Sequence, residues 1–287
     1  MTGSAPTTFI AGASRRPRTP PRTGFRWGEW SLWLVAGAFA LFLALPVVAL
    51  VVRSIVEGAL VEALTTQVVV DALILSLLTT GISLIITVIF GLPLAFVMAR
   101  RTFRGSTLLE AVVDLPIVVP PAVAGLGLLL VFGRRGVIGE ALGLSIPFTT
   151  FAVILAQVFV SAPFFVRSAR TGIVSVDGDL EDAARVDGAT ERQLFRSVTA
   201  PLASTALAAG LVMTWARAMG EFGATIMFAG NIEGRTQTLP LVVYSEFQAG
   251  SLDSSIAAAA ILVLAALGVL VAVRVFRWGR VVDTRSL

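Results

Sequence analysis

The chain has 287 residues, of which 56% are hydrophobic and 14% charged, with a formal net charge of +4 and a mean hydropathy of +0.89. Soluble chains carry about 25% charged residues, so this composition excludes an ordinary soluble domain. The absence of cysteine and histidine excludes disulfides and thiolate chemistry and removes the commonest metal ligand. We predict an all-α, polytopic membrane protein with no catalytic residues and no metal site, whose positive charge reflects membrane topology and not nucleic-acid binding.

Residues 1–28 are rich in Pro, Ser, Thr, Gly and Arg and show almost no apolar periodicity. This composition is typical of a disordered tail. The apolar run that follows is too long for a signal peptide, and no convincing cleavage site accompanies it. We expect the arginines of the tail to hold it in the cytoplasm, and a lipid- or nucleic-acid-binding role of the tail is the alternative.

Six apolar blocks follow, each of roughly the 20 residues that a helix needs to cross the hydrocarbon of a bilayer. We predict one transmembrane domain over residues 29–287, with spans at about 31–52, 73–98, 110–132, 149–166, 204–228 and 255–275. With the N-terminus inside, 17 arginines fall in inner segments and four in outer loops. The positive-inside rule expects this bias, so both termini and the loop at 167–203 are predicted to be cytoplasmic.

The loop between the fourth and fifth predicted spans is unusually polar for this chain. Asp179 is predicted to cap a short helix with an acidic first turn, and Gly188 offers the left-handed backbone that ends many helices. Thr190 and Gln193 fit the capping-box pattern of a second short helix, which Pro201 is expected to stop. Two capped helices that meet at a glycine suit a docking element for another protein, and a solvated inter-span loop is the alternative.

This loop resembles the signature loop of binding-protein-dependent ABC transporter permeases, in which E-A-A is followed by a glycine and then by I-x-L-P. The matching positions are Asp182, Ala183, Ala184, Gly188, Val198, Ala200 and Pro201. Asp182 and Val198 keep the character of the Glu and Ile of the pattern, whereas Ala200 is smaller than its Leu. The resemblance implies a coupling helix that sits in a groove of a cytoplasmic ATPase dimer. It assigns ATPase coupling to Glu181, Asp182, Ala183, Ala184, Gly188 and Pro201.

The chain contains no G-x-x-x-x-G-K-[ST] phosphate loop. We therefore expect no cofactor on this chain and ATP with Mg²⁺ on the partner ATPase. The resemblance further implies a type I ABC importer fold in the plasma (inner) membrane of a prokaryote. It implies two more partners, an extracytoplasmic solute-binding protein and a second permease copy that forms a homodimer.

Prolines and an acidic residue stand inside the third predicted span. Pro116, Pro120 and Pro121 kink a helix and free backbone carbonyls, which a membrane tolerates only where protein or a watery cavity satisfies them. For Pro120 and Pro121, a packing kink and a role in the pathway both stay open. Asp114 is costly at this depth unless it is paired or near the interface.

Arg217 and Glu221 lie one helical turn apart in the fifth predicted span. A central arginine costs about 2.5–3.5 kcal/mol on insertion scales, which an i,i+4 carboxylate partly offsets. A structural ion pair and contact with a transported ligand are the two interpretations. A pathway for an anion needs hydroxyl and amide groups that bind it weakly. Further candidates for the pathway or outer gate are Thr225, Asn231, Thr236 and Thr238.

The stretch G-E-F-G-A-T, followed by a loop that ends in T-Q-T-L-P, resembles the permeases of molybdate/tungstate importers more than those of the related sulfate/thiosulfate importers. The resemblance covers residues 30–275 and implies import of a tetrahedral oxyanion, with sulfate or thiosulfate as the alternative cargo. An ABC permease for another small solute is a further alternative. An ion-coupled secondary transporter would place more ionisable groups deep in its spans, and a membrane enzyme would need a catalytic cluster.

Overall fold

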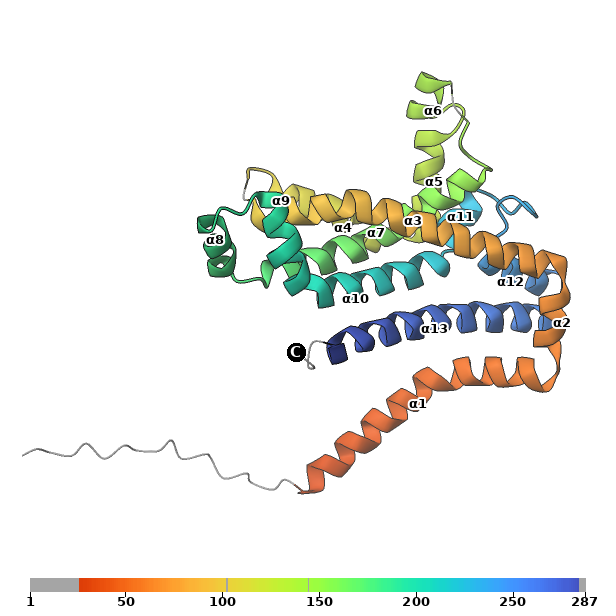
Figure 1. Ribbon diagram of the computed structural model, residues 1–287. Coiled ribbons are helices and arrows are strands. Elements are labelled where there is room, and N and C mark those ends of the chain that lie inside the picture. Colours follow the sequence, from red (N-terminus) through yellow and green to blue (C-terminus); the bar gives the residue numbers. More distant parts are fainter. Residues whose placement is uncertain (1–25, 102, 144, 284–287) are drawn as a thin grey trace, which may run out of the picture. The chain divides into compact units, whose positions relative to one another are not determined.

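A computed structural model describes residues 26–101, 103–143 and 145–283, and the regular structure of these residues is helical throughout (Figure 1). The chain divides into two compact units by its contacts, Met1–Pro46 and Val47–Leu287. The single transmembrane domain over 29–287 stays a prediction. The tail predicted at 1–28 lies outside the described residues as far as residue 25. Residues 26–28 already belong to the first helix.

The described part of the first unit is the beginning of helix α1 (Arg26–Val56), which continues into the second unit beyond Pro46. The stretch Trp30–Val56 is long and apolar enough to cross a membrane, and it contains the span predicted at 31–52.

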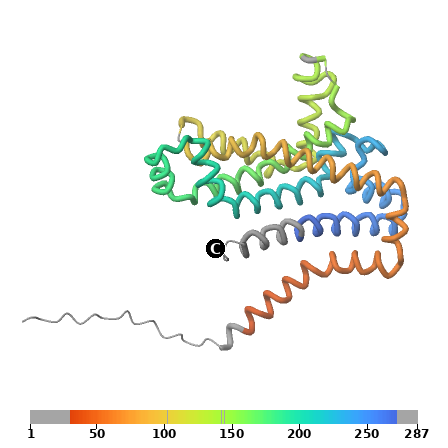
Figure 2. The backbone as a smooth tube through the Cα atoms, viewed as in Figure 1, coloured from red at the N-terminus to blue at the C-terminus, as the bar shows by residue number. Residues whose placement is uncertain are grey.

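The second unit contains the remaining helices, whose backbone Figure 2 follows in chain order. They are α2 (Ala59–Thr65), α3 (Gln67–Arg100), α4 (Ser106–Val118), α5 (Pro121–Phe132), α6 (Val137–Leu142), α7 (Thr150–Val174), α8 (Gly178–Val186), α9 (Glu191–Leu194), the π-helical segment η1 (Phe195–Thr199), α10 (Ala200–Met219), α11 (Gly223–Phe228), α12 (Leu239–Gln248) and α13 (Leu252–Asp283). Among the described residues, six stretches are candidate membrane spans by length and composition, which confirms the predicted number.

Helix α7 is the centre of the second unit and packs against both α3 and α10 (Figure 1). Its contact with α10 is close because Gly172 has no side chain: a Cβ there would lie 2.5 Å from the Cβ of Ala206. Small residues bring transmembrane helices together in this way, since lipid chains give little hydrophobic drive for helix association.

The face of α3 that packs into the unit also consists of small residues, and several of them carry hydroxyl groups. Ser76, Thr80, Ser83, Thr87 and Gly91 recur every three or four residues and are all buried. The hydroxyls of Ser76, Thr80 and Ser83 find partners on other elements; the Ser76 side chain, for example, accepts a hydrogen bond of 2.8 Å from the backbone N–H of Leu239. The hydroxyls thus fasten α3 where apolar packing alone is weak.

The third predicted span, 110–132, is not one helix. Helix α4 ends at Val118 and α5 begins at Pro121, with Val119 and Pro120 in extended backbone between them. A proline lacks the N–H of the helical hydrogen bond and disfavours helical backbone in the residue before it, so the Pro120–Pro121 pair separates the two helices. Pro116 lies inside α4 without ending it.

The fifth predicted span, 204–228, is interrupted as well, although it contains no proline at the break. Helix α10 ends at Met219, and α11 begins at Gly223. The Glu221 carboxylate accepts a 2.7 Å hydrogen bond from the backbone N–H of Ala224 and so satisfies a donor at the start of α11. At this point a hydrogen bond from a side chain takes the place of the backbone hydrogen bonds of a continuous helix.

Candidate coupling site

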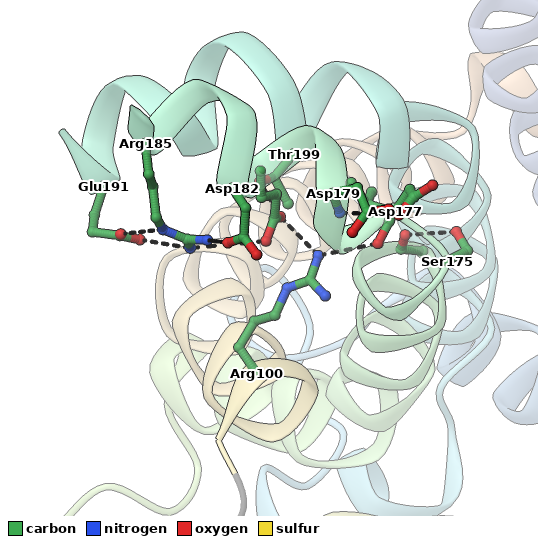
Figure 3. A network of polar contacts seen from close by, with 11 residues as sticks. Arg100, Ser175, Asp177, Asp179, Asp182, Arg185, Glu191 and Thr199 are labelled. Carbon is green, nitrogen blue, oxygen red and sulfur yellow. Dashed lines mark hydrogen bonds and ion pairs between the residues drawn. The ribbon is translucent and has the colours of Figure 1, made fainter. Parts of the chain in front are cut away.

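The polar segment predicted between the fourth and fifth spans begins with helix α8. Its N-cap is Asp177, whose side chain accepts from the backbone N–H of Asp179 at 3.0 Å (Figure 3). The prediction that Asp179 is the cap was wrong by two residues. Gly188 follows the helix with φ +85°, and the backbone N–H of Ala189 bonds to the carbonyl of Ala184 at 3.0 Å. The predicted left-handed glycine after the first short helix is confirmed.

The second predicted helix begins where expected but does not end at Pro201. Thr190 and Gln193 form the predicted capping box, with 2.9 Å between the Thr190 N–H and the Gln193 side chain. From Glu191 the chain stays helical through η1 and α10 as far as Met219. Pro201 lies in the first turn of α10, where its missing N–H costs little because a π-helical turn precedes it.

Glu181 is the buried centre of the segment, with 4% of its surface exposed. Its Oε1 atom accepts 2.7 Å hydrogen bonds from Nη2 of Arg100, the last residue of α3, and from the hydroxyl of Thr199 in η1 (Figure 3). The carboxylate therefore joins three elements: α8, the end of α3 and the start of the long helix that follows. The sequence assigned Glu181 to coupling but gave no sign of Arg100 or Thr199 as its partners.

A second, exposed set of charges ties α8 to α9. Arg185 donates to Glu191 at 2.9 Å and to Asp182 at 2.7 Å (Figure 3). Hydrogen bonding to Glu191 raises the pKa of Arg185, and the same bond lowers the pKa of the Glu191 carboxyl below its usual range. Both residues are thus charged at neutral pH, and the angle between the two short helices is braced on the solvent side.

Apolar side chains remain uncovered on this otherwise polar helix. Val186 is 88% exposed and Leu180 51%. Ala183 is exposed and Ala184 half-buried, so the middle of the helix is smooth. Helix α8 thus leaves apolar surface at these two side chains available to a protein partner.

The predicted ion pair of the fifth span exists, but at the break between α10 and α11. Nη1 of Arg217 lies 2.6 Å from Oε2 of Glu221. Glu221 is buried, whereas the side chain of Arg217 is 28% exposed. The pair therefore braces the helix break, and whether Arg217 also meets a ligand stays a prediction.

The other predicted pathway residues lie in different surroundings. The hydroxyl of Thr236 accepts from the N–H of Ile232 at 2.9 Å, and Asn231 donates to Ser245 at 2.7 Å. Thr225, Thr236 and Thr238 are buried, and Asn231 is exposed. Pro120 and Pro121 form the break between α4 and α5. The structure does not gather these residues into one site, and their part in a pathway stays a prediction.

Sequence reasoning missed Gln157, a fully buried amide on α7. Its Nε2 donates to Thr80 at 3.3 Å and to the carbonyl of Ala218 at 3.2 Å, and its Oε1 accepts from Ser83 at 3.0 Å. The amide thereby holds the end of α10 against α3 and α7. A lone polar residue in an apolar run was the only available signal.

The carboxylate of Asp114, flagged in the sequence as costly, has a partner. Nε and Nη2 of Arg167 on α7 donate to its two oxygens, each at 2.6 Å. One helical turn away, Arg170 bonds to Glu110 at 2.6 Å. Two ion pairs thus link α4 to α7. The described residues contain no group of three or more acidic side chains that could hold a metal ion.

The sequence of this chain is similar to those of known transport proteins. Residues 91–283 match the family model described as "binding-protein-dependent transport system inner membrane component". The chain is 40% identical over 251 residues to the molybdenum transport system permease protein ModB of Mycobacterium bovis, covering 86% of this chain and 92% of that protein. It is 35% identical to the molybdate/tungstate transport system permease protein WtpB of Pyrococcus abyssi over 87% of this chain and 96% of that one.

Solved structures agree on the fold. A bacterial ABC transporter that imports the acidic polysaccharide alginate matches with a TM-score of 0.70 and 18% identity, over 87% of this chain and 94% of that one. The MetNI methionine ABC transporter matches with a TM-score of 0.57 and 21% identity, over 73% and 95%. These are type I importer permeases, as the sequence predicted. From the family match and the curated relatives, we conclude that the chain belongs to the binding-protein-dependent transport system inner membrane components.

Proposed function

We propose that this chain is the membrane-spanning permease subunit of an ATP-driven importer of molybdate or tungstate. The observation that supports this cargo is the sequence identity of 35–40%, along most of the chain, to molybdenum and molybdate/tungstate permeases. The family's members are transport subunits and not enzymes, and a separate ATPase supplies the hydrolysis of ATP. The sulfate alternative has less support, because the relatives named above carry molybdenum or tungstate in their names.

Helix α8 is the docking element for that ATPase in this proposal. Its uncovered Val186 and Leu180 supply apolar contact, and its smooth middle at Ala183 permits close approach. Docking there would put α8 and both chain termini in the cytoplasm of an inner-membrane protein, with ATP and Mg²⁺ on the ATPase dimer. The distribution of arginines supports this orientation.

Glu181 transmits the movement of the docked helix in this proposal. Because it is bonded to Arg100 and Thr199, a displacement of α8 acts on the end of α3 and on the start of the helix that becomes α10. Rigid elements that move together in this way are the usual means of coupling distant sites. The exposed pair of Arg185 with Glu191 keeps α8 and α9 from moving separately.

Two further partners complete the proposed assembly. A related alginate transporter has been solved with its periplasmic protein bound, and it matches this chain with a TM-score of 0.68. An extracytoplasmic solute-binding protein that selects the oxyanion fits this fold. A second copy of the permease would enclose a pathway between the two chains, and we propose a homodimer.

The test is import by the reconstituted complex. The permease is placed in proteoliposomes with its ATPase and its solute-binding protein, and ATP hydrolysis and uptake are measured with molybdate, tungstate and sulfate in parallel. We expect molybdate or tungstate to stimulate both activities, and sulfate to stimulate neither. Omission of the binding protein is the control. Stimulation by sulfate alone would replace the proposed cargo by the alternative.

A further inference from the structure

A groove of about 720 Å³ runs along α7 and α10, next to the attachment of the docking helix. Gly172 and Ser175, at the end of α7, line it just before α8 begins. Leu202 and Ala203 line it from the first turn of α10. Movement of α8 would therefore change the width of this groove.

Most hydroxyls in the groove are already used as donors. Ser168 donates to the carbonyl of Ala206 at 2.8 Å, and Ser175 donates to that of Gly172 at 2.8 Å. Thr171 donates to the carbonyl of its own helix one turn back. These oxygens can offer only lone pairs to a passing molecule, and lone pairs repel an anion.

The strong donor in the groove is Arg167. Its Nε and Nη2 are engaged by Asp114, and Nη1 has no hydrogen bond to the described residues. The Arg167 side chain is 59% exposed, whereas that of Asp114 is 30% exposed. Arg167 thus lines the groove with one guanidinium nitrogen left over, while the paired carboxylate opposes its charge.

A neighbouring ion pair allows a structural role to be compared with a transport role. Arg170 and Glu110 join the same two helices at the same distance of 2.6 Å, but Arg170 does not line the groove. If ion pairing served only to fasten α4 to α7, the two pairs would be equivalent. They differ in that one faces the space beside the docking helix.

We propose that Arg167, held by Asp114, is a transfer site for the oxyanion in this groove. The inference rests on the proposed function and adds a place in the chain where the cargo is met. A dianion is attracted to the free edge of Arg167, and Asp114 repels it enough for release, because a pathway must bind its cargo weakly. Asp114 thus sets the residence time of the oxyanion.

The experiment compares Asp114→Asn with Glu110→Gln in the reconstituted complex. Asparagine keeps the size of the side chain and can still accept from Arg167, so the link between α4 and α7 persists. Retention of radiolabelled molybdate by the nucleotide-free complex and its rate of import are measured, together with thermal stability. We expect D114N to bind molybdate about tenfold more tightly and to import it more slowly, since one opposing charge is gone. E110Q should match the wild type in molybdate affinity.

A second substitution makes the result specific. In D114N, the added change Arg167→Gln should return the affinity for molybdate to the wild-type level. The proposal is overturned if D114N assembles normally and binds molybdate no more tightly, or if E110Q changes the affinity equally. If the wild-type complex imports neither molybdate nor tungstate, the proposed function fails and the transfer site falls with it. Wild-type import together with an unaltered D114N would overturn the transfer site alone.

Discussion

The guanidinium of Arg100 and the carboxylate of Glu181 meet at 2.7 Å, although 81 residues separate them in the sequence. Arg100 ends α3, and Glu181 lies in the first turns of α8. The pair is the direct polar link between a long membrane helix and the proposed docking helix. The Glu181 carboxylate is shielded from water, so its negative charge is stable only while Arg100 is paired with it.

Replacement of Glu181 by Gln should uncouple the complex without preventing its assembly. The amide keeps a bond to Thr199 but leaves Arg100 without its counter-charge, at a cost of about 1–3 kcal/mol. We expect the ATPase to remain bound while the stimulation of ATP hydrolysis by the loaded binding protein falls several-fold. Asp179→Asn, on the same helix but exposed, is the control and should behave as wild type in this assay. Equal loss in both variants would contradict the role of the buried pair.

Replacement of Val186 by Ser tests the docking surface itself. Val186 is exposed in the permease, so the substitution should not change its stability. Burial of a valine in an interface contributes about 1.5 kcal/mol, which corresponds to roughly a tenfold loss of affinity for the ATPase. The affinity is measured by titration of detergent-solubilised permease with the ATPase. Val137→Ser, at a valine of α6 that is 80% exposed, is the matched control, and unchanged affinity in V186S would rule out α8 as the contact.

Replacement of Gly188 by Val should abolish ATPase association through the backbone. At φ +85° a β-branched residue is strained by about 1–2 kcal/mol or more, so the turn between α8 and α9 would change shape. Asparagine tolerates this conformation better, and Gly188→Asn should retain most of the association. Co-purification of the ATPase with membrane-inserted permease measures the difference. Normal association of the valine variant would show that the turn does not position the docking helix.

Replacement of Gly172 by Ala should loosen the packing of α7 on α10. The new methyl group would lie 2.5 Å from the Cβ of Ala206, and overpacking of this kind costs about 1–3 kcal/mol. Thermal unfolding in detergent should show a lower Tm. The double variant with Ala206→Gly removes the clash and should recover most of the stability. A Tm that the second change does not restore would count against the close helix contact.

Replacement of Glu221 by Gln should weaken the break between α10 and α11. The amide oxygen can still accept from the N–H of Ala224, but the charge that opposes Arg217 is lost. The uncompensated arginine in a membrane segment lowers stability by about 1–3 kcal/mol, which lowers the Tm in detergent. Arg217→Gln in the same chain should recover part of this loss. Without such recovery, the ion pair would not be the source of the stability.

Local sequence signals predicted local structure well. The capping box of Thr190 and Gln193 and the left-handed Gly188 depend on neighbours within a few residues, and both are confirmed. The number of apolar stretches is confirmed for the same reason, because hydropathy is a property of each stretch alone. Asp177 and Asp179 both fit a helix start, so local pattern could not choose between them.

Features that depend on distant partners were not predictable. The burial of Glu181 requires Arg100, and nothing near residue 181 indicates which arginine comes close. The break after Met219 has the Glu221 cap and the hydrogen bond of Gln157 to Ala218 beside it, and no proline marks it in the sequence. Pro201, in contrast, was given too much weight as a helix stop, because the π-helical turn before it accommodates a proline within the continuous helix.

The uninterrupted helical stretch from Glu191 to Met219 would act as a lever arm in the proposed mechanism. Its 29 residues span about 43 Å at the rise of an α-helix, although the π-helical turn shortens this slightly. A tilt of about 5° at the docking end would displace the other end by about 4 Å, which resembles the helix shifts of known conformational switches. In the proposed mechanism, a small rotation of the ATPase would thus be enlarged into a larger displacement at the far end, at the point where Glu221 interrupts the rod.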